Sequence, residues 1–193
     1  GRLAGPRTAA STAAAHSLRI VRETDRQGAC QFSAVACQVY GDVSRHPEVR
    51  RLACAELRAH PERYASFPEL DGEGEPMWVF EAARPRDFRS FLSFVERMGR
   101  RGEYGCHATL HALVQVFRRR ALVHVAERDN TLVVPAPEGA ADTEPFRFVL
   151  ELDRHYYAAL PQDAAEPQLG AGLSWSGVAA APTALPCASS VAV

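Results

Sequence analysis

The sequence predicts an α+β domain of the segregated kind, in which helices come first and a small sheet follows. Apolar residues recur every three or four positions through the first part of the 193-residue chain, and they alternate with polar residues after residue 120. Hydrophobic residues make up 47% of the chain, which is enough for a packed core. We expect one domain at 17–162, between a flexible segment at 1–16 and a Pro-, Ala- and Gly-rich tail at 163–193.

Four amphipathic helices are expected within this domain. The first begins at Cys30 and is stopped by Gly41, and the second begins at about Pro47, a residue suited to a first helical turn. The remaining two cover about 88–95 and 110–117.

Short strands follow the helices. Alternating patterns predict strands at 121–126, 131–134 and 146–152, and the first two have the spacing of a hairpin. A further short strand begins at His155, and residues 18–21 form either a strand or a lead into the domain.

Composition and charge exclude several classes of function. The net charge of −1 gives no general reason to expect a nucleic acid or membrane partner, and no apolar run reaches the roughly 18 residues of a membrane helix. Five cysteines without a CxxC pair argue against a disulfide framework and a structural zinc site, so we expect a reducing compartment.

All 22 basic residues are arginine, and the chain contains no lysine. A GC-rich genome explains this bias together with the abundant Ala, Pro and Gly. Avoidance of ubiquitin attachment, for which lysine is the usual acceptor, is a second explanation, and the two are compatible.

Cys30 is the candidate nucleophile because it stands where a glycine-containing loop turns into a helix. Unsatisfied N–H groups at a helix N-terminus stabilise a thiolate, and Gly28 allows the unusual backbone angles of an oxyanion-binding loop. Cys106, beside His107, is the only rival cysteine in front of a helix.

His155 is the candidate base, since nucleophile and base are often distant in sequence; a structural histidine at a strand start is the alternative.

These residues lie in segments that resemble the OTU (ovarian tumour) deubiquitinases. The matching segments, in the family's order, are GACQFSAVA at 28–36, QVYG at 38–41, HPEVR at 46–50, RGEYGCHATL at 101–110 and HY at 155–156.

The resemblance implies a papain-like OTU cysteine protease fold, with a small twisted sheet packed between helices. It implies hydrolysis of isopeptide bonds at the C-terminus of ubiquitin through a thioester on Cys30, with His155 as general base and no cofactor or metal. It also implies an oxyanion loop of Gln27, Gly28 and Ala29, and a substrate channel flanked by Tyr104, Gly105 and Tyr156. We expect Tyr104 to pack under the active site, with substrate contact as the alternative.

Two positions depart from the family pattern. Gln27 stands where the family has Asp, and Tyr157 stands where the Asn or Asp of the triad is expected. Asp153 shares a strand face with His155 and is the first candidate for the orienting carboxylate, followed by Asp25. The Tyr157 hydroxyl and a simple Cys–His dyad stay open.

Two other classes of function follow from these departures. One is a catalytically weak OTU-like module that binds ubiquitin, and the other is a papain-like peptidase with another substrate. The expected partner is ubiquitin, polyubiquitin or a ubiquitin-like modifier, bound by a monomer. The expected location is the cytoplasm, which is the host cytoplasm if the chain comes from a virus or an intracellular pathogen.

Overall fold

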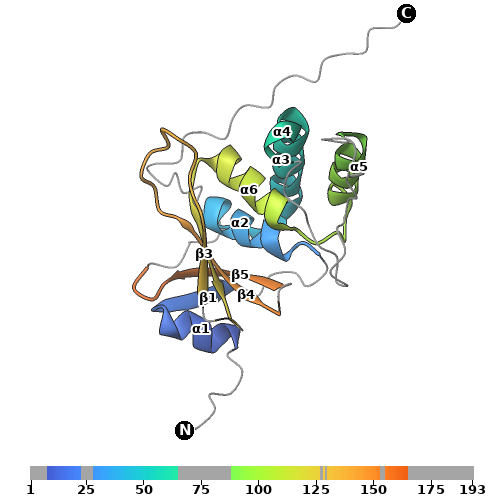
Figure 1. The fold of residues 1–193 in the computed structure, drawn as a ribbon. Coiled ribbons are helices and arrows are strands. Elements are labelled where there is room, and N and C mark those ends of the chain that lie inside the picture. The colour runs from blue at the N-terminus through green and yellow to red at the C-terminus, as the bar shows by residue number, and fades with distance from the viewer. Residues whose placement is uncertain are drawn as a thin grey trace, which may run out of the picture.

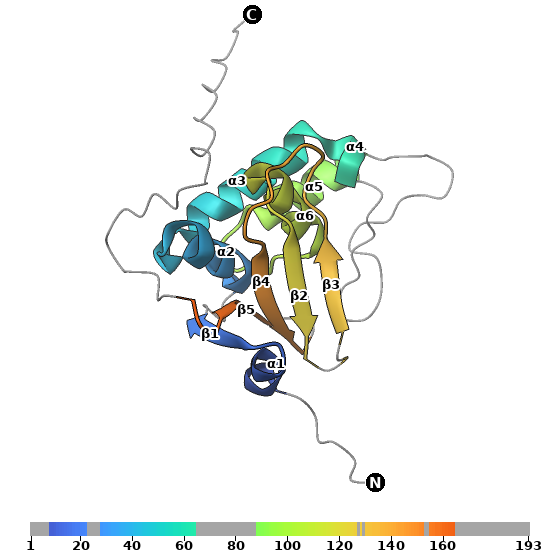
Figure 2. The same cartoon turned by 90° about the vertical axis from the view of Figure 1, so that its left-hand side faces the viewer.

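A mixed β-sheet lies between one N-terminal helix and a layer of the other helices (Figures 1 and 2). The computed structural model describes residues 8–22, 28–64, 88–126, 128, 130–152 and 155–164. The helices are α1 (Ala9–Ala15), α2 (Cys30–Tyr40), α3 (His46–Ala59), α4 (Pro61–Tyr64), α5 (Phe88–Met98) and α6 (His107–Phe117), with a 3₁₀ turn, η1 (Val43–Arg45), before α3. The strands are β1 (Leu18–Arg22), β2 (Ala121–Val125), β3 (Asn130–Val134), β4 (Phe146–Glu151) and β5 (His155–Pro161).

The strand order of the sheet is β1-β5-β4-β2-β3. The predicted β2–β3 hairpin is confirmed, with Val123 opposite Leu132. β4 pairs with β2 in parallel and with β5 antiparallel, and β1 closes the other edge against β5. Alternation within a strand predicted where the strands lie but not this order, because pairing depends on contacts far apart in sequence.

Helix α2 lies at the centre of the molecule, between the sheet and α3 (Figure 1). Nine of its residues are buried, so it has almost no exposed face. Gly41 ends it in the left-handed conformation, with φ of 67°, which confirms the predicted stop. The predicted starts of the other helices differ from the observed ones by a few residues at most.

The prediction that residues 1–16 form a flexible segment is wrong for the part that the structure describes. Alanine-rich α1 begins with a capping box, in which Thr8 and Ser11 satisfy each other's backbone N–H groups. The Ala9 N–H donates to the Glu151 carboxylate (2.8 Å), and the buried side of α1 packs under β4 and β5. The domain therefore includes α1, and residues 165–193 lie outside the described residues.

None of the described helices is both long and apolar enough to span a membrane.

The buried side chain of His124 makes the stability of this fold depend on pH. His124 on β2 is 6% exposed, its Nδ1 lies 2.8 Å from the Thr131 hydroxyl, and its ring centroid is 4.0 Å from that of His16. Burial and then the neighbouring His16 lower the pKa of His124 to about 4.

We expect the free energy of unfolding to decrease as the pH falls from about 6.5 to about 4. In this window the unfolded chain has bound a proton at His124 while the folded chain has not. The free energy of unfolding therefore decreases by up to about 1.4 kcal/mol per pH unit. Urea unfolding of His124→Gln at several pH values should show a shallower decrease, with the remainder due to groups such as His111. An unchanged slope would contradict this role for His124.

Candidate functional site

The strand pairing brings Cys30 and His155 to the same end of the sheet. β1 and β5 are antiparallel with Arg22 opposite Ala158, so the chain leaves β1 at the end where β5 begins. β5 begins at His155, three residues or about 10 Å before Ala158. Helix α2, which begins at Cys30, packs against β5. Cys30 and His155, far apart in sequence, therefore lie on two elements that pack against each other.

Cys30 is the first residue of α2 and only 1% exposed. The carbonyl of Ala29, the N-cap, accepts the Ser33 N–H (2.8 Å), so regular helical bonding starts directly at the cysteine. No side chain caps this helix end. The first-turn N–H groups and the helix dipole consequently act on the Cys30 sulfur, as expected for a thiolate nucleophile.

The other described cysteines are poorer candidates for a nucleophile. Cys37 and Cys54 lie inside α2 and α3 and not at a helix N-terminus, and burial raises the pKa of the Cys54 thiol. Cys106 is the N-cap of α6, and its backbone N–H donates to the Thr109 hydroxyl (2.7 Å) in a capping box, so this rival at a helix N-terminus also has a structural role. Cys187 lies outside the described residues.

Gly28 is required by its close contact with the loop that precedes α6. Its φ is 88°, and a Cβ atom there would stand 2.1 Å from the Gly102 carbonyl oxygen. No side chain fits this space, so the backbone of the predicted oxyanion loop rests directly on residues 102–103.

Arg50 of α3 joins these two loops. Its buried guanidinium donates to the carbonyls of Gly28 (3.0 Å), Glu103 (2.7 Å) and Met98 (2.7 Å). Its guanidinium carbon also lies 4.1 Å from the centroid of the Phe32 ring. The planar fork of arginine suits such multiple contacts. Arg50 belongs to the HPEVR segment at 46–50, but its role appears only from the tertiary contacts.

Gln31, next to the nucleophile candidate, connects α2 to the start of α6. Its buried amide donates to the Cys106 carbonyl (3.0 Å) and accepts from the Thr109 hydroxyl (2.7 Å). A Cβ atom on Gly105 would lie 2.4 Å from Gln31 Oε1, which explains the glycine. Two segments matched separately in the sequence thus form one hydrogen-bonded unit.

His155 is half-buried, and its ring meets the edge of the Tyr157 ring at a centroid distance of 4.4 Å. The Tyr157 hydroxyl donates to the Glu151 carboxylate (3.1 Å), and Glu151 is the cross-strand partner of His155. The three side chains therefore share one face of the sheet. Glu151 was not predicted, because its position opposite His155 depends on the register of β4 against β5.

Three predicted site residues, Asp25, Gln27 and Asp153, lie outside the described residues. Their roles stay predictions.

The predicted channel residues have different surroundings. Tyr104 is 50% exposed, so the expectation that it packs under the site is wrong. Tyr156 is buried with its ring edge-on to Phe148 at a centroid distance of 5.8 Å, so its ring belongs to the core and not to a channel wall. Strand alternation explains this, since Tyr156 points to the face opposite Tyr157. Among the described residues, no three His, Cys, Asp or Glu side chains gather to hold a metal ion.

A central helix that begins with cysteine thus packs beside a strand that begins with histidine. The OTU domain of OTUD1 is similar to this chain with a TM-score of 0.56 and 16% identity, over 78% of this chain and 91% of that one. An OTU deubiquitinase from Wolbachia pipientis wMel, solved bound to ubiquitin, has a TM-score of 0.51 and 12% identity, over 78% and 99%.

Curated proteins point to the same family. Arabidopsis thaliana OVARIAN TUMOR DOMAIN-containing deubiquitinating enzyme 10 is 26% identical over 149 residues, 77% of this chain. Human OTU domain-containing protein 5 is 23% identical over 158 residues, 80% of this chain. The matched regions span only 36% and 24% of these two relatives. No family model matches. The chain has the OTU fold, and these matches support an OTU-family protein.

The contact of Gly28 with residues 102–103 predicts unequal effects of two alanine substitutions. Gly28→Ala should lower the free energy of unfolding by about 2–4 kcal/mol, since strain at positive φ adds to a steric clash. Gly102→Ala is the matched control: its φ is 93°, but a Cβ there meets nothing within 4 Å, so only about 1–2 kcal/mol is expected. Urea denaturation measures both, and equal losses would contradict the close contact.

Arg50→Lys should destabilise the protein by about 2 kcal/mol, although it keeps the charge. A single ammonium cannot reach three carbonyls held around a planar fork, so buried acceptors lose their donors. Arg63→Lys, which alters an exposed pair with Glu56, is the control and should change stability by less than about 1 kcal/mol. Chemical denaturation at neutral pH checks this, and similar effects of both substitutions would be the contrary result.

Proposed function

We propose that this chain is a cysteine deubiquitinase that hydrolyses isopeptide bonds at the C-terminus of ubiquitin. The observation that carries the proposal is the position of Cys30, at the N-terminus of a buried helix and directly after a loop whose conformation only glycine permits. Two matches support the substrate: a curated relative is named a deubiquitinating enzyme, and an OTU deubiquitinase of the same fold was solved bound to ubiquitin.

In the proposed reaction, the Cys30 sulfur attacks the carbonyl carbon of ubiquitin's C-terminal glycine. His155 accepts the thiol proton and then donates it to the departing lysine amine, which leaves a thioester on Cys30. Water, activated by His155, hydrolyses the thioester and restores the thiol. Backbone N–H groups at Cys30 and in the loop around Gln27 and Gly28 stabilise the oxyanion.

The ring of His155 needs a fixed orientation for these proton transfers. The edge contact with Tyr157 restricts the ring, and Tyr157 is itself held by its hydrogen bond to Glu151. Asp153 stays our proposed orienting carboxylate, with Asp25, the Tyr157 hydroxyl and a dyad as alternatives. We propose that the protein acts as a monomer in the cytoplasm, where its thiols stay reduced.

The alternative is a ubiquitin-binding module with weak activity. Two observations favour it: Cys30 is almost fully buried, and Tyr157 replaces the usual Asn or Asp. Binding to ubiquitin without reaction would distinguish this module from an enzyme.

Ubiquitin with a C-terminal electrophile tests the proposal directly. The unmodified chain should form one covalent adduct, at Cys30. Cys30→Ala should abolish the adduct, and His155→Gln should slow it at least about 100-fold. Cys106→Ala is the matched control at the N-terminus of another helix and should react at the original rate, because the proposed nucleophile is Cys30. Intact mass and peptide mapping report the outcome.

Labelling at Cys106 would overturn the site assignment. Absence of any adduct, together with measurable ubiquitin binding, would overturn the enzyme proposal and establish the binding module.

A further inference from the structure

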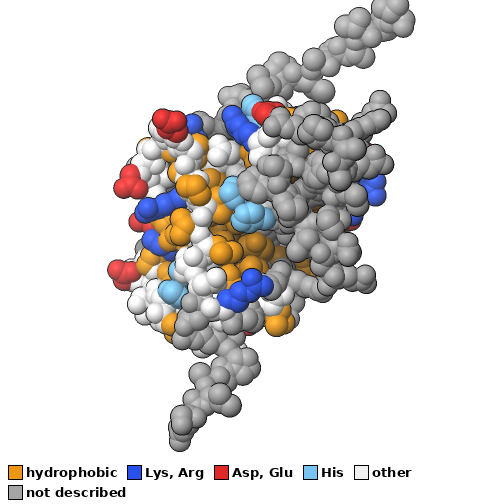
Figure 3. Space-filling view, in the orientation of Figure 1, with side chains coloured by type: hydrophobic (Ala, Val, Ile, Leu, Met, Phe, Trp, Pro, Cys, Tyr) orange, Lys and Arg blue, Asp and Glu red, His pale blue; other side chains and the backbone are white. Residues whose placement is uncertain are grey.

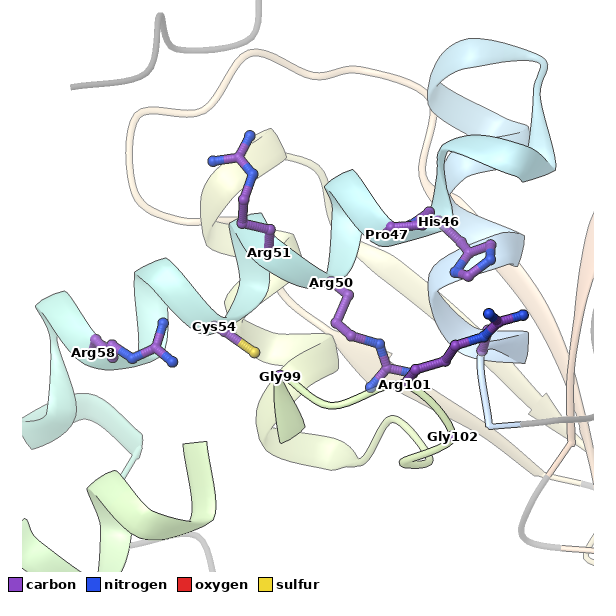
Figure 4. A pocket seen from close by; sticks show the side chains of 10 residues that line it. His46, Pro47, Arg50, Arg51, Cys54, Arg58, Gly99, Arg101 and Gly102 are labelled. Carbon is purple, nitrogen blue, oxygen red and sulfur yellow. The ribbon is translucent and has the colours of Figure 1, made fainter. Parts of the chain in front are cut away.

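A pocket of about 530 Å³ lies between α3 and the loop that follows α5 (Figure 4). Four arginines and a histidine line it: Arg50, Arg51, Arg58, Arg101 and His46. The other lining residues are small or apolar, and none of the described lining residues is acidic. A concentration of cations on one concave surface is unexpected in a chain whose net charge is −1.

Carboxylates do not neutralise these arginines within the described part of the chain. Arg51, Arg58 and Arg101 form no ion pair or hydrogen bond there, whereas Arg45, Arg63 and Arg147 each pair with a glutamate. Arg50 donates only to backbone carbonyls, which carry no formal charge. On the face shown in Figure 3, the visible basic side chains are scattered among other residues.

The positions of the cations fit an extended ligand better than a single ion. Arg51 and Arg58 are seven residues apart on α3, so they lie on the same side and about 10 Å apart along the axis. Figure 4 shows Arg58 extending toward Cys54 at one end of the pocket and Arg101 extending toward His46 at the other. One phosphate cannot reach both ends.

We propose that this pocket binds a small polyanion that carries several phosphate groups. Guanidinium groups bind phosphate and carboxylate oxygens in bidentate fashion, but each phosphate group brings about −1.5 to −2 charges against one for a carboxylate, so several phosphates match this set of cations best. No Phe, Tyr or Trp is among the described lining residues, so the pocket lacks the stacking platforms by which single-stranded nucleic acids are held.

The pocket is continuous with the loop before Cys30. Ala29 and Gly102 line it, and the Arg50 guanidinium donates to the Gly28 carbonyl. Burial lowers the pKa of Arg50, so a bound anion compensates the cost of keeping this cation desolvated. Bound phosphate should therefore hold Arg50 and the loop in place. Any effect of the bound anion on catalysis at Cys30 rests on the proposed function, whereas the binding of the anion itself does not.

Calorimetric titration tests the site with four probes at 0.15 M salt: inositol hexakisphosphate, pyrophosphate, citrate and a single-stranded oligonucleotide. We expect inositol hexakisphosphate to bind in the micromolar range, more tightly than pyrophosphate, with citrate and the oligonucleotide much weaker. The variant R51Q/R58Q/R101Q should weaken binding of inositol hexakisphosphate at least about tenfold. The variant R63Q/R118Q/R120Q removes the same charge from surfaces outside the pocket and should bind like the original chain.

Hydrogen exchange in the same samples reports the link to the loop. Inositol hexakisphosphate should slow exchange at residues 28–30 and 99–103 in the original chain and in Cys30→Ala, but not in R51Q/R58Q/R101Q. Equal weakening by both triple variants would overturn the site as non-specific charge attraction, and tight oligonucleotide binding would overturn it in favour of nucleic acid. Because Cys30→Ala must still bind, loss of enzyme activity and loss of this site are separable results.

Discussion

The guanidinium of Arg50 is the contact on which the rest of the site depends. It lies on a helix that carries no proposed reacting group, yet its three hydrogen bonds join the segment before Cys30, the end of α5 and the loop before α6. Two of these segments are loops and the third is a helix end, and each contributes a carbonyl that needs a donor once it is buried. One arginine satisfies all three and thereby sets where the loops lie relative to one another.

The close packing of backbone on backbone follows from this arrangement. Gly28 can approach Gly102 only because it has no side chain, and Arg50 holds the two loops at that separation. On the other side of Cys30, Gln31 repeats the pattern with Gly105 and Cys106. The residues before and after the nucleophile candidate are therefore each fastened to the same loop. Such rigid support is what preorganised oxyanion binding needs.

The sheet contributes the other half of the site, and its two faces have different roles. Tyr156 faces α2 and belongs to the main core, while Tyr157 faces α1 and contacts both His155 and Glu151. Glu151 also accepts the N–H of Ala9, so α1 is connected to the strand that begins with the candidate base. The N-terminal helix is consequently part of the domain's support for His155, and not an appendage to it.

The sequence alone determined the local features of this protein. Periodicity placed the helices and strands, Gly41 marked a helix end, and a glycine-containing loop before a helix identified Cys30, because these depend on residues adjacent in the chain. Motif order identified the family. Tertiary structure decided the strand order, the burial of Tyr156, the exposure of Tyr104 and the positions of Arg50, Gln31 and Glu151. These depend on which distant segments come together, and no local pattern encodes the register or the hydrogen-bond partners of such contacts.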